Sequence, residues 1–244
     1  MRITVELITN KIPLSGHRYL ILSLIKNVLQ KENPSLFREM YENHEDYQFR
    51  TKSFTYALKL NDFKFVGDEI ELEGNAVITI STPDIVLGST LYNAFLLTKN
   101  YNYSKEYNVE IGRVNVLKEK TVNSNVVLFK TLSPICIKDS NGEFLKIDNP
   151  NYEKELNYFM DKVLESYRGS GLKEQLIFEP ILMTKRVAKE KIAKFTERTN
   201  KEIFYITAYE GVFKLTGNKE DLNLIYKLGC GNRRSSGFGT LQIV

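Results

Sequence analysis

The sequence contains no tryptophan, and only two of its 244 residues are cysteine and two are histidine. Cys136 and Cys230 lie far apart in the chain, which excludes both a disulfide framework and the paired spacing of a zinc site. This sparse cysteine usage indicates a reducing cytosol. Two histidines are also too few for a histidine-rich metal centre, so the sequence predicts neither a metal nor another cofactor.

Long apolar runs are absent as well. No stretch approaches the roughly 18 residues that are needed to cross a bilayer. The opening segment MRITVELITN alternates in polarity and lacks the apolar region of a signal peptide. We therefore expect a cytoplasmic protein without a membrane partner. The composition, 42% hydrophobic and 26% charged, is that of a soluble globular chain with one large or two small domains.

The net charge of +4 is unevenly distributed along the chain. Residues 1–122 contain 15 basic and 15 acidic side chains, whereas residues 123–244 contain 19 basic and 15 acidic ones. The stretch KRVAKEKIAKFTERTNK, residues 185–201, alone has seven basic and two acidic residues. Such a patch fits either a polyanionic partner or the solvated face of a hairpin.

Periodicity in the first half predicts the order strand, helix, strand, strand, helix, strand. Alternating polarity predicts strands in MRITVEL (1–7), KSFTYALKL (52–60), NAVITIS (75–81) and YNVEIGRVNVLKEK (107–120), with an added hairpin in FKFVGDEIELEG (63–74). Helices are predicted in residues 15–34, where Ile21, Leu24, Ile25, Val28 and Leu29 share one face, in the short segment 34–43, and in residues 82–99. Thr82 is the expected N-cap of the last helix, with Pro83 at its first position.

The second half repeats this order. Strands are predicted in residues 125–138, 174–185, 202–217 and 239–244, and helices in residues 151–167 and 218–229, with Asn218 as the cap of the second helix. The basic stretch falls between the second and third strands. We therefore predict an α+β fold of two tandem ferredoxin-like (RRM-like) βαββαβ domains, residues 1–121 and 122–244, joined at the polar link KEKTVNSN.

The loop GCGNRRSSGFG, residues 229–239, lies between the last predicted helix and the last predicted strand. It lacks the spacing of a P-loop and of the dinucleotide fingerprint. Glycine gives the backbone unusual conformational freedom, and exposed amides beside Arg233 and Arg234 suit a phosphate group. A simple turn between a helix and a strand needs only one glycine, so phosphate or nucleic-acid binding is the favoured interpretation.

The two histidines are candidates for proton transfer. His17 lies near the start of the first helix, and His44 lies in the polar segment YENHEDYQFRTK. Tyr41 precedes His44 by three residues, and Lys52 follows it by eight. A proton-transfer group near a fixed cation is the minimum for metal-free cleavage of a phosphodiester. Either histidine can also be read as an inert polar residue. No serine or cysteine nucleophile motif is present.

Taken together, the loop GCGNRRSSGFG, the segment TLSPICI (131–137) and the helix IPLSGHRYLILSLIKNVLQKENP followed by KSFTYAL resemble one family. It is the family of CRISPR-associated endoribonucleases that cut precursor CRISPR RNA within its repeats, part of the RAMP superfamily of RNA-binding proteins. The resemblance covers nearly the whole chain. It implies metal-independent cleavage by the 2′-hydroxyl, which leaves a 2′,3′-cyclic phosphate and a 5′-hydroxyl.

The resemblance also implies site residues. His44 and Lys52 lie where the family has a catalytic histidine and lysine, and Tyr41 takes the usual histidine place when no gap is allowed. Lys26 occupies the place of a first-helix tyrosine found in some members, and His17 is the alternative catalytic histidine. RNA is expected to lie between the domains and along the glycine-rich loop. The expected RNA-binding residues are Gly229, Gly231, Arg233, Arg234, Ser235, Gly237, Gly239, Arg18, Lys185, Arg186, Lys189 and Lys191.

The expected partner is therefore CRISPR repeat RNA, with a homodimer and hand-over to a CRISPR effector complex as further implied associations. Two alternatives compete with the nuclease. One is a RAMP subunit that binds RNA in an interference complex without cutting it. The other is a ferredoxin-like module that only associates with proteins, which leaves the arginines of the glycine-rich loop without a role.

Overall fold

The first half of the chain forms a five-stranded antiparallel sheet. The computed structural model describes every residue except 43–50, 192–196 and 198–201. The elements of this half are β1 (Arg2–Ile8), β2 (Lys11–Pro13), α1 (His17–Glu32), α2 (Pro34–Tyr41), β3 (Thr55–Leu60), β4 (Phe63–Val66), β5 (Glu69–Leu72), β6 (Ala76–Ser81), α3 (Ile85–Leu97), β7 (Asn100–Asn102) and β8 (Asn108–Val116). The strand order in the sheet is β3-β6-β1-β8-β7.

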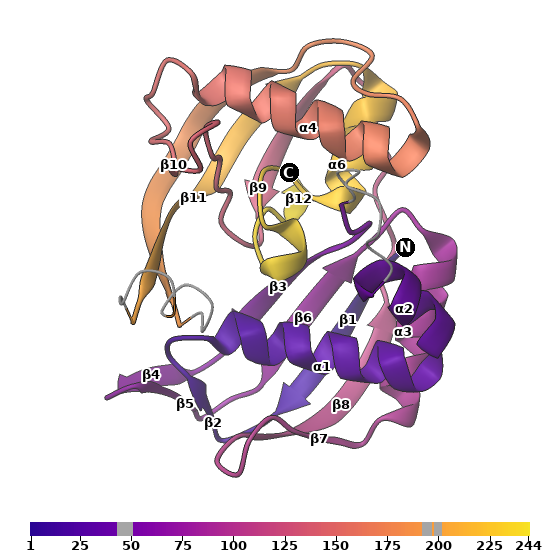
Figure 1. Ribbon diagram of the computed structural model, residues 1–244, viewed down its shortest axis with the longest axis vertical. Coiled ribbons are helices and arrows are strands. Elements are labelled where there is room, and N and C mark those ends of the chain that lie inside the picture. Colours follow the sequence, from indigo (N-terminus) through magenta and orange to yellow (C-terminus); the bar gives the residue numbers. More distant parts are fainter. Residues whose placement is uncertain (43–50, 192–196, 198–201) are drawn as a thin grey trace.

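The second half forms a four-stranded sheet in the order β10-β11-β9-β12. Its elements are β9 (Val126–Thr131), α4 (Tyr152–Arg168), β10 (Ile177–Glu190), β11 (Phe204–Thr216), α6 (Lys219–Leu228), the short 3-10 helix η1 (Arg234–Ser236) and β12 (Leu241–Ile243). This half lies above the first in Figure 1, and the glycine-rich loop with η1 lies between the two.

Both sheets have the strand arrangement of the ferredoxin-like fold. In each half the first strand pairs with the third and the fourth, and the second strand pairs with the third: β1, β3, β6 and β8 in one, β9, β10, β11 and β12 in the other. The predicted α+β fold of two tandem βαββαβ units is confirmed. The proposed division between residues 121 and 122 lies within the segment that links β8 to β9.

Each half has its own apolar core beneath its helices. The predicted stripe of α1 is buried, with Leu20, Ile21, Leu24, Ile25, Val28 and Leu29 packed into the first core. A second core forms around α4 and α6 and includes Leu156, Met160, Leu222 and Ile225. Burial of such a stripe is the main force that holds a short helix in place. In the part of the chain that the structure describes, no helix is long and apolar enough to cross a membrane.

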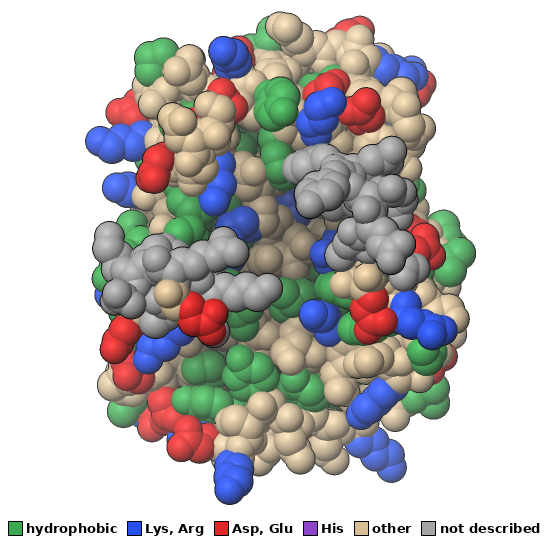
Figure 2. All heavy atoms as spheres, viewed as in Figure 1, with side chains coloured by type: hydrophobic (Ala, Val, Ile, Leu, Met, Phe, Trp, Pro, Cys, Tyr) green, Lys and Arg blue, Asp and Glu red, His purple; other side chains and the backbone are tan. Residues whose placement is uncertain are grey.

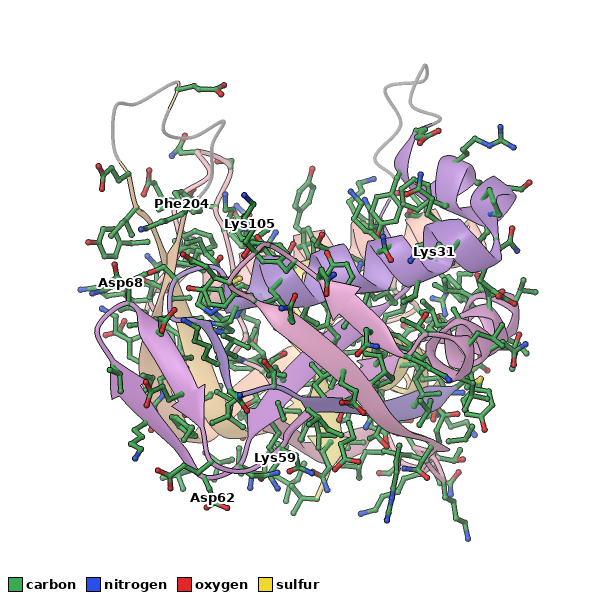
Figure 3. The ribbon with its side chains drawn as sticks, turned by 90° about the horizontal axis from the view of Figure 1, so that it is seen from below. Lys31, Lys59, Asp62, Asp68, Lys105 and Phe204 are labelled. Atoms are coloured by element: carbon green, nitrogen blue, oxygen red, sulfur yellow. The ribbon has the colours of Figure 1, made fainter. Side chains whose placement is uncertain are left out.

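The hairpin predicted around Gly67 and Asp68 is confirmed as β4–β5. It pairs with β2 as a separate three-stranded sheet, β2-β5-β4, that extends away from the main sheet. Asp62 marks the base of this hairpin and Asp68 its tip (Figure 3). Phe63 and Phe65 on β4 are exposed and pack against each other edge to face. The hairpin therefore presents aromatic rings to solvent.

Three boundaries and two short strands differ from the sequence prediction. The N-cap of α3 is Asp84, whose side chain accepts a hydrogen bond from the Leu87 amide, because the Thr82 hydroxyl instead donates to the Ser53 carbonyl. The first strand of the second half ends at Thr131 rather than at residue 138. Strand β10 continues through the basic residues to Glu190. The short strands β2 and β7 were missed. The predicted cap Asn218 is confirmed, since it accepts from the Glu220 amide.

Candidate active site

The glycine-rich loop joins the two halves of the protein. Its η1 turn packs on β3 and on the start of α1, and the buried Thr55 hydroxyl lies at the centre of the contact. That hydroxyl lies 3.3 and 3.0 Å from the carbonyls of Arg234 and Phe238 and 2.9 Å from the Thr240 hydroxyl. Ser133 adds a bond to the Tyr56 carbonyl. The loop therefore belongs to the interface between the halves.

Two positions of the loop, Gly237 and Gly239, have no room for a side chain. Gly237 has φ of +84°, and a Cβ at this position would come within 2.9 Å of the Tyr56 ring. A Cβ on Gly239, with φ of +71°, would overlap the Cys230 carbonyl oxygen. Both residues therefore need glycine for the backbone conformation and also for the close approach of a neighbour. Gly237 is thus required by packing between the halves, and Gly239 by packing within the loop.

The glycine amides of the loop are already bonded within the protein. The amides of Gly229 and Gly239 donate to the carbonyls of Ile225 and Pro134, and the Gly237 amide donates to Arg234. The Gly231 amide points at the Met160 sulfur. The four glycines are also buried. This differs from the expected cradle of exposed amides, because the close packing that requires glycine also supplies the acceptors.

The two adjacent arginines have opposite surroundings. Arg234 is 4% exposed, and its guanidinium donates to the Leu228 carbonyl at 2.8 Å. Burial lowers the pKa of Arg234 to about 10, and the side chain supports the loop from inside, out of reach of a bound phosphate. Arg233 is half-buried and donates to the Tyr19 hydroxyl at 3.1 Å. Of the pair, Arg233 alone has a guanidinium near the surface.

A buried ion pair fixes the end of β10 against α1. The guanidinium of Arg18 lies 3.3 Å from a carboxylate oxygen of Glu190, which is 1% exposed. The same guanidinium lies over the Phe238 ring of the glycine-rich loop at 4.7 Å from its centroid. Burial raises the pKa of Glu190. Arg18, predicted to bind RNA, therefore connects three elements around the interface.

The predicted basic residues of the second half lie along the end of β10. Lys185, Arg186 and Lys189 are exposed on this strand, and Lys191 is exposed just beyond it. Arg186 forms an ion pair with Glu210 on β11. Lys185, Lys189 and Lys191 have no ion pair among the described residues. They provide cationic charge beside the space between the halves.

Two of the predicted catalytic residues are in contact. Lys52 lies just before β3, and Tyr41 is the last residue of α2. The ammonium of Lys52 lies 4.7 Å from the centroid of the Tyr41 ring. A third side chain, Lys26 on α1, places its ammonium 4.5 Å from the same centroid. The Tyr41 hydroxyl is buried without a partner among the described residues, and burial raises its pKa. Tyr41 is therefore a neutral phenol at physiological pH.

Of the two candidate histidines, only His17 lies among the described residues. His44 lies outside the described residues. His17 contacts the Leu14 carbonyl through Nδ1 at 3.0 Å, and because a carbonyl only accepts, Nδ1 carries the proton. Burial lowers the pKa of His17 to about 4, so this imidazole is neutral near pH 7 and cannot donate an acidic proton there. It lines a cavity of about 540 Å³, whereas Lys52 lines a different one of about 960 Å³.

Two further residues of α1, Lys26 and Tyr19, belong to the candidate site but are not among the residues that the sequence predicts there. Both line a third cavity, of about 750 Å³, together with Ser23, Asn27 and Gln30. The polar face of α1 was visible in the sequence, because Tyr19, Ser23, Lys26 and Gln30 are spaced by three or four residues. In Figure 2 the surface is hollowed between the two halves, and Lys and Arg side chains lie around the hollow.

The described residues contain no obvious site for a metal or a reactive thiol. No group of three or more histidine, cysteine, aspartate or glutamate side chains comes together in this part of the chain. Cys136 and Cys230 are both buried, and burial raises the pKa of each thiol to about 12. Neither cysteine is a nucleophile in this state.

Comparisons with known proteins agree with this arrangement. The profile of the family described as "CRISPR associated protein Cas6, C-terminal" matches residues 117–243. The chain is 28% identical over 245 residues to the CRISPR-associated endoribonuclease Cas6 of Pyrococcus furiosus, with 96% of this chain and 84% of that protein covered. It is 25% identical to the CRISPR-associated endoribonuclease Cas6 1 of Methanocaldococcus jannaschii, with 98% and 91% covered.

A solved structure shares the fold over the whole chain. It is described as a RAMP protein that binds different RNA substrates, and its TM-score to this chain is 0.80 at 18% identity. The alignment covers 100% of this chain and 99% of the other. At this identity the likeness concerns the fold, and it agrees with the two ferredoxin-like units found above.

Proposed function

The chain belongs to the Cas6 family of CRISPR-associated proteins, and from this premise we propose that it is the endoribonuclease that cuts CRISPR repeat RNA in precursor transcripts. The contact between Lys52 and Tyr41 supports this proposal most directly. Two residues that were expected at the active site, from segments more than ten positions apart, meet at the surface of the first half. In this proposal the first half cuts the RNA, and the second half binds it through the basic strand and the glycine-rich loop.

The proposed reaction needs no metal, since RNA supplies its own nucleophile. The 2′-oxygen attacks the adjacent phosphorus, and the bond from phosphorus to the 5′-oxygen breaks. The products are a 2′,3′-cyclic phosphate and a 5′-hydroxyl. The enzyme must remove the proton of the 2′-hydroxyl, protonate the leaving oxygen and stabilise the negative charge that develops on the phosphate.

We assign these tasks to three residues. His44 transfers a proton, either from the 2′-hydroxyl or to the 5′-oxygen. Lys52 stabilises the charge on the phosphate, which its half-buried position strengthens because fewer water molecules compete. Tyr41 orients the Lys52 ammonium through its ring. The raised pKa of Tyr41 keeps its phenol protonated. His17 is the less suitable histidine, because burial lowers its pKa to about 4, which makes it a weak base and leaves it no acidic proton near pH 7.

RNA binding is assigned to the surface between the halves. Arg233 and Ser235 are the half-buried members of the glycine-rich loop, and Lys185, Lys189 and Lys191 are exposed nearby. Each phosphate contact of this kind releases counterions, so binding should weaken as salt increases. A second copy of the chain and a CRISPR effector complex are further proposed partners, and both can be tested by size-exclusion chromatography.

One experiment tests the activity. The protein is incubated with a single CRISPR repeat RNA in EDTA, and the products are separated and their ends identified by mass. We expect one cut, with a cyclic phosphate on one product and a 5′-hydroxyl on the other. The same RNA with a 2′-deoxy nucleotide at the cut position should bind and remain intact. Tight, salt-dependent binding without any product would instead indicate the non-cutting RAMP subunit, and absence of RNA binding would indicate a protein-association module.

A further inference from the structure

Two lysines share one aromatic ring at the proposed active site. The ammonium of Lys26 lies 4.5 Å from the Tyr41 centroid, and that of Lys52 lies 4.7 Å from it. These two distances limit the separation of the nitrogens to about 9 Å, which is about one Debye length, so the two charges repel each other. Lys26 also lies 6.0 Å from the Phe37 ring, which stacks on Tyr41. The two cations are therefore held close together by α1, α2 and the segment before β3.

This arrangement has no carboxylate in contact with either ammonium among the described residues, although Glu39, Asp84 and Glu165 line the same cavity as Lys52. Neither Lys26 nor Lys52 forms an ion pair with a carboxylate among the described residues, although ten other ion pairs are present there. Both side chains are half-buried. The pKa of Lys52 is lowered, first by burial and then by the charge of Lys26. Two like charges that repel each other at a partly buried site form a site for an anion.

We propose that Lys26 is a second catalytic cation, and that it and Lys52 together bind the two non-bridging oxygens of the phosphate that is cut. This inference rests on the proposed function. When the 2′-oxygen attacks, the phosphate gains a second negative charge, and two ammonium groups are placed to receive it. Both ammonium groups contact the Tyr41 ring, which holds them near each other and near one phosphate.

The phosphate can reach Lys26 from the surface. Lys26 lines the cavity of about 750 Å³ on the polar face of α1, together with Tyr19 and Asn27. The side-chain oxygen of Asn27 is buried there and has no partner among the described residues. Tyr19 in turn holds Arg233 of the glycine-rich loop. A strand of RNA that contacts Arg233 can therefore follow α1 to the pair of lysines.

The test compares three substitutions in the full-length chain: Lys26→Met, Lys52→Met and Lys31→Met. Methionine keeps the apolar stem over the ring and removes the charge. Lys31 is the matched control, because it lies on the same helix, is exposed and lines the groove beside α3 instead (Figure 3). Single-turnover cleavage of repeat RNA should fall about 100-fold or more for Lys26→Met and for Lys52→Met, with binding changed less than about 3-fold. Lys31→Met should cleave like the wild type.

A second readout separates contact with the phosphate from a structural role. RNA carrying a single sulfur in place of one or the other non-bridging oxygen at the cut position should slow the wild type for one stereoisomer. That difference should shrink in Lys26→Met if the lysine touches that oxygen. A structural lysine would instead lower the melting temperature and leave the stereoisomer preference unchanged. Removing a like charge predicts an equal or higher melting temperature.

The outcomes separate the two proposals. If the wild type cleaves and Lys26→Met cleaves at the same rate, the inference about Lys26 is wrong and the proposed function stands. If the wild type does not cleave, the proposed function fails, and inorganic phosphate then tests the anion site alone. Phosphate should raise the melting temperature of the wild type and of Lys31→Met more than that of Lys26→Met. Equal shifts in all three proteins would exclude the site.

Discussion

The glycine-rich joint, where residues 229–239 pack against Thr55 and Tyr56, differs from the lysine pair on Tyr41 in how its polar groups are bonded. At the joint, the Thr55 and Thr240 hydroxyls bond to each other, the amides of Gly229, Gly237 and Gly239 donate to carbonyls, and even Arg234 is buried with a carbonyl partner. At the lysine pair, two ammonium groups have no carboxylate partner among the described residues, and the Tyr41 hydroxyl is unpartnered there as well. A polar group that is fully bonded contributes to the fold, whereas one left without a partner is open to a substrate.

This comparison assigns different consequences to mutations in the two regions. Changes near the lysine pair should slow cleavage and leave the free energy of unfolding almost unchanged. Changes to the buried glycines and threonines of the joint should lower the free energy of unfolding and alter cleavage only through the loss of folded protein. The following predictions test this division, from the largest expected effect to the smallest.

The largest effect is expected from His44→Ala. Loss of a proton-transfer group typically slows the chemical step by about 10²–10⁴-fold, equivalent to about 3–5 kcal/mol of the barrier. Single-turnover cleavage of repeat RNA measures the rate, and filter binding measures the affinity, which should not change. His17→Ala is the control, since burial lowers the pKa of His17 to about 4 and leaves its imidazole neutral near pH 7. If His17→Ala loses the activity and His44→Ala keeps it, the roles of the two histidines must be exchanged.

At the joint, Gly237→Val should destabilise the fold by about 3 kcal/mol or more. About 1–2 kcal/mol comes from the left-handed backbone at φ of +84°, and the remainder from contact with the Tyr56 ring at 2.9 Å. Gly142→Val is the matched control, because Gly142 has the same φ of +84° but no atom within 4 Å of the added Cβ. Urea unfolding measures both variants.

The difference between these two glycines isolates the contact across the interface. If Gly142→Val and Gly237→Val lose equal stability, the backbone conformation alone is responsible and the joint contributes little. If Gly237→Val also abolishes RNA binding while the protein remains folded, the loop binds RNA directly. Its glycines would then have a role beyond packing.

Much of the fold could be predicted from the sequence because the signals are local. The stripe of α1 from Ile21 to Leu29 and the hairpin at Gly67 depend on neighbours within a few residues. The cap of α3 was misassigned to Thr82 because that hydroxyl bonds to Ser53, which is 29 residues away in the chain. A local pattern cannot reveal which partner wins such a competition.

The site was less accessible for the same reason. The adjacent arginines 233 and 234 look equivalent in the sequence, yet one faces Tyr19 and the other is buried beneath the loop. Their difference depends on Thr55, which lies 179 residues from Arg234 and fixes its carbonyl. The pairing of Lys26 with Lys52 likewise arises only when α1 packs on α2. Residue type indicated the chemistry, and long-range packing decided which residues perform it.

The smallest effect concerns the pH dependence of cleavage. Lys52 must be protonated to stabilise the phosphate, so the rate should fall as the pH rises through the pKa of Lys52. Burial and the charge of Lys26 lower that pKa. Lys26→Met removes the like charge, and the pKa of Lys52 should then rise. Because the two ammonium groups are separated by a partly hydrated surface, this shift should be small. The alkaline limb of the rate profile should therefore move to higher pH in Lys26→Met, although its maximum rate is lower, and Lys31→Met should keep the wild-type profile.

A limb that moves to lower pH would mean that Lys26 stabilises the protonated form of Lys52, which contradicts the repulsion between them. A limb that does not move would mean that some group other than Lys52 titrates there.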